Sequence, residues 1–96
     1  MQSATSRLSI SATRADALFA SVLQRSEEPS AAQVRLAIAA AIRAFGAEGC
    51  AARVAEAYGE HPETAVLRMR WARATVDRDR KAGRAAGGRR PDLTAA

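Results

Sequence analysis

Arginine is the residue whose frequency and spacing in this sequence most suggest a chemical role. The 96 residues include 15 basic and 10 acidic side chains, for a net charge of +5. Arg68, Arg70 and Arg73 fall within two turns of one predicted helix. Guanidinium groups bind phosphate oxygens in pairs of hydrogen bonds, so this spacing predicts an edge that contacts nucleic acid. The alternative is a solvated face on which Asp77 and Asp79 pair with cations three or four residues away.

Three further arginines follow in the C-terminal segment 82–96. Arg84, Arg89 and Arg90 have no acidic neighbour until Asp92. Basic segments of this kind attract nucleic acid without reading its sequence. We therefore add these three arginines to the candidate DNA-binding residues and expect the segment to be a disordered basic tail.

The sequence offers little for catalysis or metal binding. One cysteine, Cys50, and one histidine, His61, allow neither an internal disulfide nor the usual set of zinc ligands. Cys50 as nucleophile and His61 as base would lack a third group to orient the base. We expect no enzyme activity, no cofactor and no small-molecule substrate. Cys50 is expected to be a buried apolar residue. The alternative is a reactive thiol, since a position near a helix start can lower the pKa of the thiol.

The longest uncharged apolar run, Leu36 to Ile42, has seven residues. A membrane-spanning helix needs about 20 such residues, so we expect neither a membrane span nor a membrane partner. The single cysteine is typical of a reducing compartment, and the expected location is the cytoplasm.

The elements that must position these residues are all helical. Alanine is frequent, apolar residues recur at helical spacing, and Ser30 with Gln33 forms a capping-box pattern. Gly46 suits a helix end, and His61 followed by Pro62 suits a helix start. We predict an all-α bundle of three to four helices over 13–81, with a flexible N-terminus over 1–12. The predicted helices span about 15–25, 31–45, 50–58 and 62–80.

The last two predicted helices carry the pattern of a helix-turn-helix. Ala55 is small enough for a close helix crossing, Gly59 tolerates a left-handed turn, and Ala65 supplies the buried residue beyond it. Such a motif lays its second helix in the major groove of DNA. The segment from Ala65 also places Met69, Ala72 and Val76 on one predicted core stripe.

Residues 54–76 resemble the promoter-reading C-terminal domain of extracytoplasmic-function sigma factors. The resemblance rests on Val54-Ala55-Glu56-Ala57, Gly59, Thr64, Arg68, Met69, Ala72 and Arg73. It implies that Thr64 and Arg68 lie near phosphates or bases, and that Arg70 and Arg73 lie along the duplex. The block from Gly49 and Cys50 to Arg73 also looks like short actinobacterial proteins of no assigned function, a likeness that implies no chemistry.

The sequence departs from the family pattern on one face of this segment. Val66 and Leu67 stand where the family has polar residues, and Trp71 stands where a basic residue is common. Leu67 and Trp71 lie opposite the core stripe, so we expect an interaction seam for a second copy or another protein. The predicted function is therefore a small helix-turn-helix DNA-binding protein, a bacterial transcription regulator that binds double-stranded DNA. The alternative is a helical interaction module, an adaptor or regulator that does not bind DNA.

Overall fold

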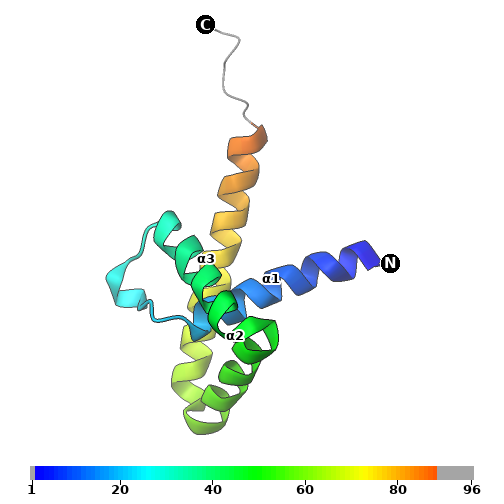
Figure 1. Ribbon diagram of the computed structural model, residues 1–96. Helices are drawn as coiled ribbons and strands as arrows, with labels where there is room; N and C mark the ends of the chain where they lie inside the picture. Colours follow the sequence, from blue (N-terminus) through cyan, green and yellow to red (C-terminus); the bar gives the residue numbers. More distant parts are fainter. Residues whose placement is uncertain (1, 89–96) are drawn as a thin grey trace, which may run out of the picture.

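The computed structural model describes the backbone of residues 2–88 and the side chains of residues 10–83. Its elements are the helices α1 (Gln2–Ala20), α2 (Ala31–Glu60) and α3 (Pro62–Gly88), with a short 3₁₀ helix, η1 (Arg25–Glu27), between α1 and α2 (Figure 1). The described part of the chain contains no strand, which confirms the all-α prediction. Over that same part, no helix combines the length and apolarity that a membrane crossing requires.

A sharp bend at Gly46 divides α2 into a first arm (31–45) and a second arm (47–60). Gly46 has φ 73° and ψ 168°, a backbone conformation that L side chains rarely adopt. Gly49 is also required by the bend, because a Cβ there would lie 2.9 Å from the Cβ of Phe45. The predicted helix end at Gly46 is confirmed. The second arm follows at once, without the loop expected before residue 50.

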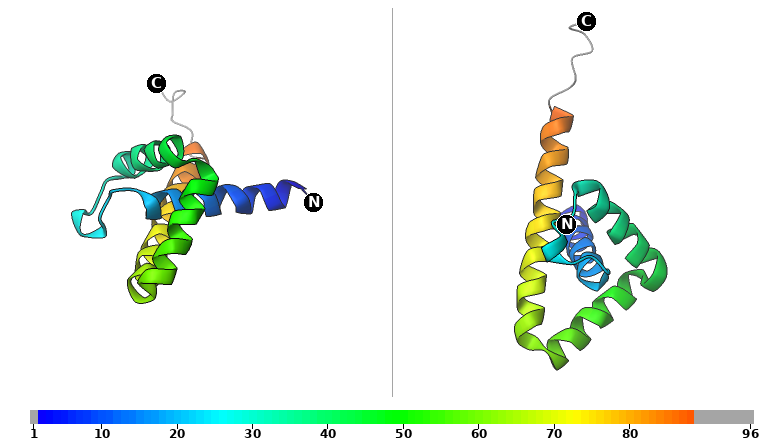
Figure 2. Two further views of the ribbon diagram at one scale, coloured as in Figure 1. Left: turned by 60° about the horizontal axis from the view of Figure 1, so that its bottom comes forward. Right: turned by 90° about the vertical axis from the view of Figure 1, so that its left-hand side faces the viewer.

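The bent α2 and the straight α3 surround the C-terminal half of α1. Viewed along α1, α3 lies on one side and the two arms of α2 lie on the other (Figure 2). The core is built largely from small side chains, which let the helices approach closely. The predicted stripe of Ala65, Met69, Ala72 and Val76 is buried. The other core residues are Ala15, Ala17, Leu18, Phe19, Val34, Ile38, Ala41 and Cys50.

The end of α1 differs from the prediction. The helix ends at Ala20, not near residue 25, and Val22 is consequently 90% exposed. The Ser21 side chain explains the difference: its hydroxyl donates to the Leu18 carbonyl at 2.6 Å and accepts from the Leu23 amide at 3.3 Å. These bonds offer the backbone an alternative to another helical turn.

The outer helix ends also differ from the predicted bounds. α1 already begins at Gln2, within the segment 1–12, and α3 continues past residue 80 to Gly88. No proline interrupts either extension, and the glycines in the extension of α3, Gly83 and Gly87, weaken the helix without ending it. Residues 89–96 lie outside the described part of the chain.

The predicted helix starts near residues 31 and 62 are confirmed, whereas no separate start is found at residue 50. The Gln33 amide donates to Ser30 Oγ at 3.1 Å, and the Ser30 amide donates to Gln33 Oε1 at 2.8 Å, which completes the capping box of α2. α3 begins at Pro62, and the amide of Ala65 donates to the His61 carbonyl at 2.9 Å. Both starts depend on hydrogen bonds between residues close in sequence.

Candidate nucleic-acid interface

The connection between α2 and α3 is shorter than the turn of the predicted helix-turn-helix. The chain reverses at His61, with φ −140° and ψ 70°, while Gly59 remains inside the second arm. The His61 amide donates to the Ala57 carbonyl at 2.7 Å, which keeps the second arm helical to its end. Gly59 therefore does not supply the left-handed turn that we expected. Ala55 is exposed and does not lie at a helix crossing, whereas Ala65 is buried as predicted.

Arg68 is used inside the fold, which corrects its expected place on a phosphate-contacting edge. Its guanidinium donates four hydrogen bonds to backbone carbonyls at the end of α1 and just beyond it. Nε donates to Phe19 at 2.8 Å, and Nη2 donates to Leu18 at 3.3 Å, Ser21 at 3.0 Å and Leu23 at 2.9 Å. The last carbonyls of a helix have no partner within the helix, so Arg68 satisfies acceptors that α1 leaves unpaired.

The surroundings of Arg68 are partly apolar. Its guanidinium carbon lies 5.7 Å from the centre of the Phe19 ring and 5.2 Å from that of Trp71. Burial lowers the pKa of Arg68 below its usual value. A helical projection of the sequence indicates that Arg68 borders the core, because it lies only about 60° around the helix from the core residue Ala65.

Arg70 and Arg73 are exposed on the opposite flank of α3. With Arg80 and Lys81 they form a basic stripe at spacings of three, seven and one residues along one helix face. Residue 84 continues the same periodicity, although its side chain is outside the described set. At about 1.5 Å per residue, the stripe from 70 to 81 is about 17 Å long.

One acidic residue, Asp77, lies within the basic stripe. Arg80 contacts its carboxylate at 2.7 Å and Lys81 contacts it at 3.3 Å. Those two cations lower the pKa of Asp77, the hydrogen bond from Arg80 most strongly. Among the side chains of residues 10–83, none forms an ion pair with Arg70 or Arg73. Arg73 does lower the pKa of Asp16 on α1, against the larger effect of burial, which raises it.

Asp79 does not pair within α3. It accepts from Arg14 of α1 at 3.2 Å and from Arg35 of α2 at 2.8 Å, and only 12% of its side chain is exposed. The expectation of pairs three or four residues away is therefore confirmed for Asp77 and wrong for Asp79. A single carboxylate connects all three helices at this point.

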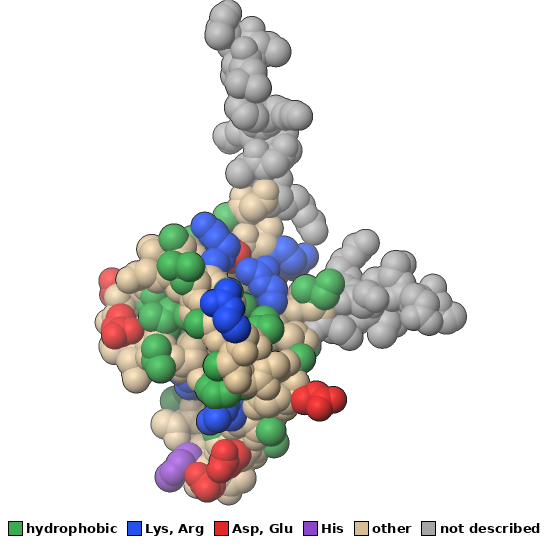
Figure 3. All heavy atoms as spheres, viewed as in Figure 1, with side chains coloured by type: hydrophobic (Ala, Val, Ile, Leu, Met, Phe, Trp, Pro, Cys, Tyr) green, Lys and Arg blue, Asp and Glu red, His purple; other side chains and the backbone are tan. Residues whose placement is uncertain are grey.

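Acidic side chains are exposed at the turn between α2 and α3. Glu60 and Glu63 flank His61 and are exposed. Acidic side chains lie beside the histidine at the lower end of the face in Figure 3, whereas basic side chains gather across its middle. Thr64 is exposed in the first turn of α3, and its hydroxyl donates to the His61 carbonyl at 3.3 Å. Negative charge around Thr64 opposes the phosphate contact that the resemblance implies.

The two residues of the predicted seam have different environments. Leu67 is 51% exposed, while Trp71 is half-buried and packs against the core. Trp71 also lies beside the guanidinium of Arg68. They therefore do not form one continuous exposed patch.

Cys50 and His61 are in different environments as well. Cys50 is completely buried, its thiol donates to the Ala41 carbonyl at 3.7 Å, and burial raises its pKa. Nearby Asp16 raises that pKa further, and Arg53 lowers it. His61 is exposed in the turn. A protonated, enclosed thiol is a poor nucleophile, so Cys50 acts as a core residue here. The described residues contain no cluster of three metal-ligating side chains.

The remaining candidate residues lie outside the described side chains. Arg84 belongs to α3, but its side chain is not among those described, and Arg89 and Arg90 lie beyond the described residues. Comparison of the chain with protein-family models, curated proteins and solved structures finds no match.

Proposed function

We propose that this chain is a small DNA-binding protein that contacts the phosphate backbone of duplex DNA through the basic stripe of α3. The observation that carries the proposal is the exposure of Arg70 and Arg73 on one face, with no ion-pair partner among the described side chains. Arginines without an acidic partner are free to replace the counterions that surround DNA.

The length and composition of the basic stripe favour contacts to phosphates over contacts to bases. A stripe of about 17 Å matches about five base pairs at about 3.4 Å each. Base readout by a helix-turn-helix uses the N-terminal end of its second helix, and α3 carries Glu63 there. Regulation of transcription would then arise from occupancy of DNA, with sequence preference supplied by other parts of an assembly.

A salt titration tests this proposal. We expect the logarithm of the affinity for a short duplex, measured by fluorescence anisotropy, to fall against the logarithm of salt concentration with a slope of about −3 to −4. The double variant Arg70→Gln/Arg73→Gln should lower the magnitude of that slope by about 2, because two phosphate contacts are lost. Affinities for unrelated duplex sequences should be similar.

The matched control removes two exposed arginines that lie outside the stripe. Arg25→Gln/Arg43→Gln changes the net charge by the same amount, and both residues are exposed. We expect this variant to keep most of the salt dependence. An equal loss in both double variants would show that net charge, not the stripe, attracts DNA, and a flat salt response would contradict the proposal altogether.

The second candidate function is a helical protein-interaction module without DNA binding. It is favoured by the exposure of two adjacent apolar residues in the first half of α3, Val66 at 41% and Leu67 at 51%. Sedimentation equilibrium distinguishes the two functions. Under this alternative, self-association is observed and is lost in Leu67→Ser, whereas under DNA binding the same variant retains its affinity for duplex DNA.

A further inference from the structure

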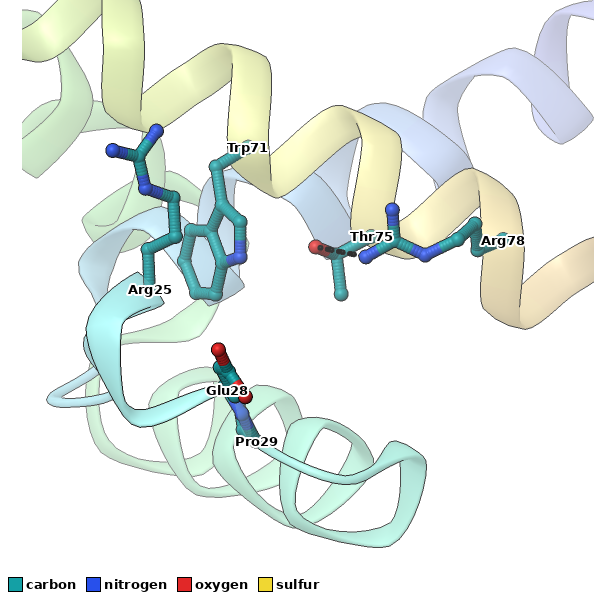
Figure 4. A pocket seen from close by; sticks show the side chains of 6 residues that line it. All are labelled: Arg25, Glu28, Pro29, Trp71, Thr75 and Arg78. Atoms are coloured by element: carbon teal, nitrogen blue, oxygen red, sulfur yellow. Dashed lines mark hydrogen bonds between the residues drawn. The ribbon is translucent and has the colours of Figure 1, made fainter.

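A pocket of about 310 Å³ lies between the α1–α2 connection and α3, away from the basic stripe. Trp71, Thr75 and Arg78 form one wall at spacings of four and three residues on α3, and Arg25, Glu28 and Pro29 form the other (Figure 4). Glu28 has a left-handed backbone, with φ 48° and ψ 59°, and its amide donates to the Arg25 carbonyl at 3.0 Å. This local turn holds the loop wall in place.

Three hydrogen-bond donors converge on one side of the pocket. Arg78 Nη2 lies 3.4 Å from Thr75 Oγ1, and Thr75 is a polar residue with only 8% of its surface exposed. The indole nitrogen of Trp71 is on the edge of the ring that faces these two side chains (Figure 4). No acceptor for that nitrogen is found among the described residues. A guanidinium, a hydroxyl and an indole N–H together form a receptor for an oxygen anion.

Arg78 is available for a ligand because its acidic neighbours are engaged elsewhere. Asp77 is paired with Arg80 and Lys81, and Asp79 is paired with Arg14 and Arg35. Its one described hydrogen bond, to Thr75, is long, so most of its five donors remain free.

The apolar and charged side chains of the pocket determine which ligand shape and charge it can bind. The Trp71 ring and Pro29 supply apolar surface against which a flat ring can pack. Arg25 and Arg78 contribute two positive charges and Glu28 contributes one negative charge, which leaves a net charge of +1. These charges favour an anion over a neutral ligand, because the two arginines attract a negative charge and outnumber Glu28, which repels it.

We propose that this pocket binds a small aromatic monocarboxylate. The carboxylate accepts hydrogen bonds from Arg78, Thr75 and the indole N–H of Trp71, and the aromatic ring packs against Trp71 and Pro29. The planar guanidinium suits the planar carboxylate. We expected no small-molecule substrate from the sequence, and periodicity along α3 does not reveal a pocket whose second wall is a loop.

Benzoate is the probe that tests this site. Trp71 is the one tryptophan of the chain, so a ¹⁵N-labelled sample has a single indole N–H resonance. We expect benzoate to move that resonance saturably, with a Kd on the order of 1 mM for a ligand of this size. Benzamide, which is neutral, is expected to bind at least several-fold more weakly.

Variants on the two flanks of α3 provide the controls. Arg78→Gln is expected to weaken benzoate binding about tenfold, and Thr75→Val by a smaller factor, because each removes a donor. Arg70→Gln removes the same charge from the basic stripe and is expected to leave the Kd unchanged. This titration contains no DNA, so its outcome is independent of the proposed DNA binding.

Three results would overturn the proposal. The first is an indole resonance that does not respond saturably to benzoate. The second is equal binding of benzamide, which would show that a carboxylate charge is not what the pocket selects. The third is an equal loss of affinity in Arg70→Gln and Arg78→Gln, which would indicate a general effect of net charge.

Discussion

The two flanks of α3 use the same residue type in opposite ways. Arg68 donates four hydrogen bonds to carbonyls at the end of α1, whereas Arg70, two residues later, is exposed to solvent. Two residues correspond to about 200° of rotation around a helix, so these side chains point in nearly opposite directions. The position of an arginine relative to a neighbouring helix end therefore decides whether it stabilises the fold or remains free for a ligand.

The acidic residues of α3 show the same division. Asp77 pairs with cations of its own helix, while Asp79, also two residues later, pairs with Arg14 and Arg35 on the other two helices. Residues that look equivalent in a charged segment therefore have separate structural roles.

The largest effect is expected from Arg68→Ala. This change removes four hydrogen bonds from a charged donor. The Phe19, Ser21 and Leu23 carbonyls lose this partner, while the Leu18 carbonyl keeps its bonds from Ser21. We expect the free energy of unfolding, measured by urea denaturation, to fall by about 3 kcal/mol. Arg68→Lys should recover little of that loss, because an ammonium lacks the planar fork that reaches several acceptors.

Arg70→Ala is the matched control for that experiment. It removes the same side chain from the exposed flank, and we expect a change of less than about 0.5 kcal/mol. Similar destabilisation in the two variants would mean that the flanks of α3 do not differ as the structure indicates.

The next effect in size is expected from Asp79→Asn. The neutral amide keeps the shape of the side chain but loses the charge that binds Arg14 and Arg35 at a largely buried position. We expect a loss of about 1 to 2 kcal/mol in the free energy of unfolding, between the values typical of exposed and buried pairs. Asp77→Asn, measured in the same way, should unfold close to the wild type, since its partners are exposed and local.

A smaller effect on stability is expected from Arg70→Gln/Arg73→Gln. Both side chains are exposed, so thermal unfolding monitored by circular dichroism should be almost unchanged while DNA affinity falls. Loss of affinity together with loss of helicity would assign these arginines to the fold and would remove the distinction between the two flanks.

The smallest effect concerns Asp16 and depends on pH. Burial raises the pKa of its carboxyl above 3.8, so the folded state retains the proton to higher pH than the unfolded state. Stability therefore falls as pH rises from the unfolded pKa through the folded pKa. We expect Asp16→Asn to raise the melting temperature modestly at neutral pH and to have no effect below about 3.8, where the aspartate is neutral in both states.

A melting-temperature series across this pH range checks the sign. A gain that grows toward acid pH would contradict the assignment of Asp16 as a carboxyl disfavoured by burial. Arg73→Gln should lower stability slightly at neutral pH, because Arg73 is the cation that lowers the Asp16 pKa.

Several features of the fold could be predicted because they depend on residues close in sequence. The capping box of Ser30 and Gln33, the helix end at Gly46 and the start of α3 at Pro62 each follow from local backbone geometry and hydrogen bonds. The core stripe from Ala65 to Val76 follows from helical periodicity. The misplaced end of α1 was harder to predict, because the Ser21 hydroxyl competes against apolar spacing that favours a longer helix.

The candidate site could be predicted only in part. Arg70 and Arg73 are exposed as a phosphate-contacting edge requires, but the sequence pattern grouped Arg68 with them and placed the turn at Gly59. A helical projection around Ala65 would have suggested that Arg68 borders the core, but it could not identify the acceptors. No pattern in the sequence indicates the pocket lined by Trp71, Thr75 and Arg78, since half of its wall comes from a loop without periodicity.

The order of the residues is enough to predict that the chain is helical, where α2 and α3 begin, that a helix ends at Gly46, and which stripe of α3 is buried. Packing of the helices is needed to show which arginines are free, which aspartate joins the helices, and where a pocket forms. Helix starts and periodic faces arise from bonds between residues a few positions apart. The roles of Arg68 and Asp79 depend on carbonyls and guanidinium groups that lie far away in the chain and arrive only when the helices pack.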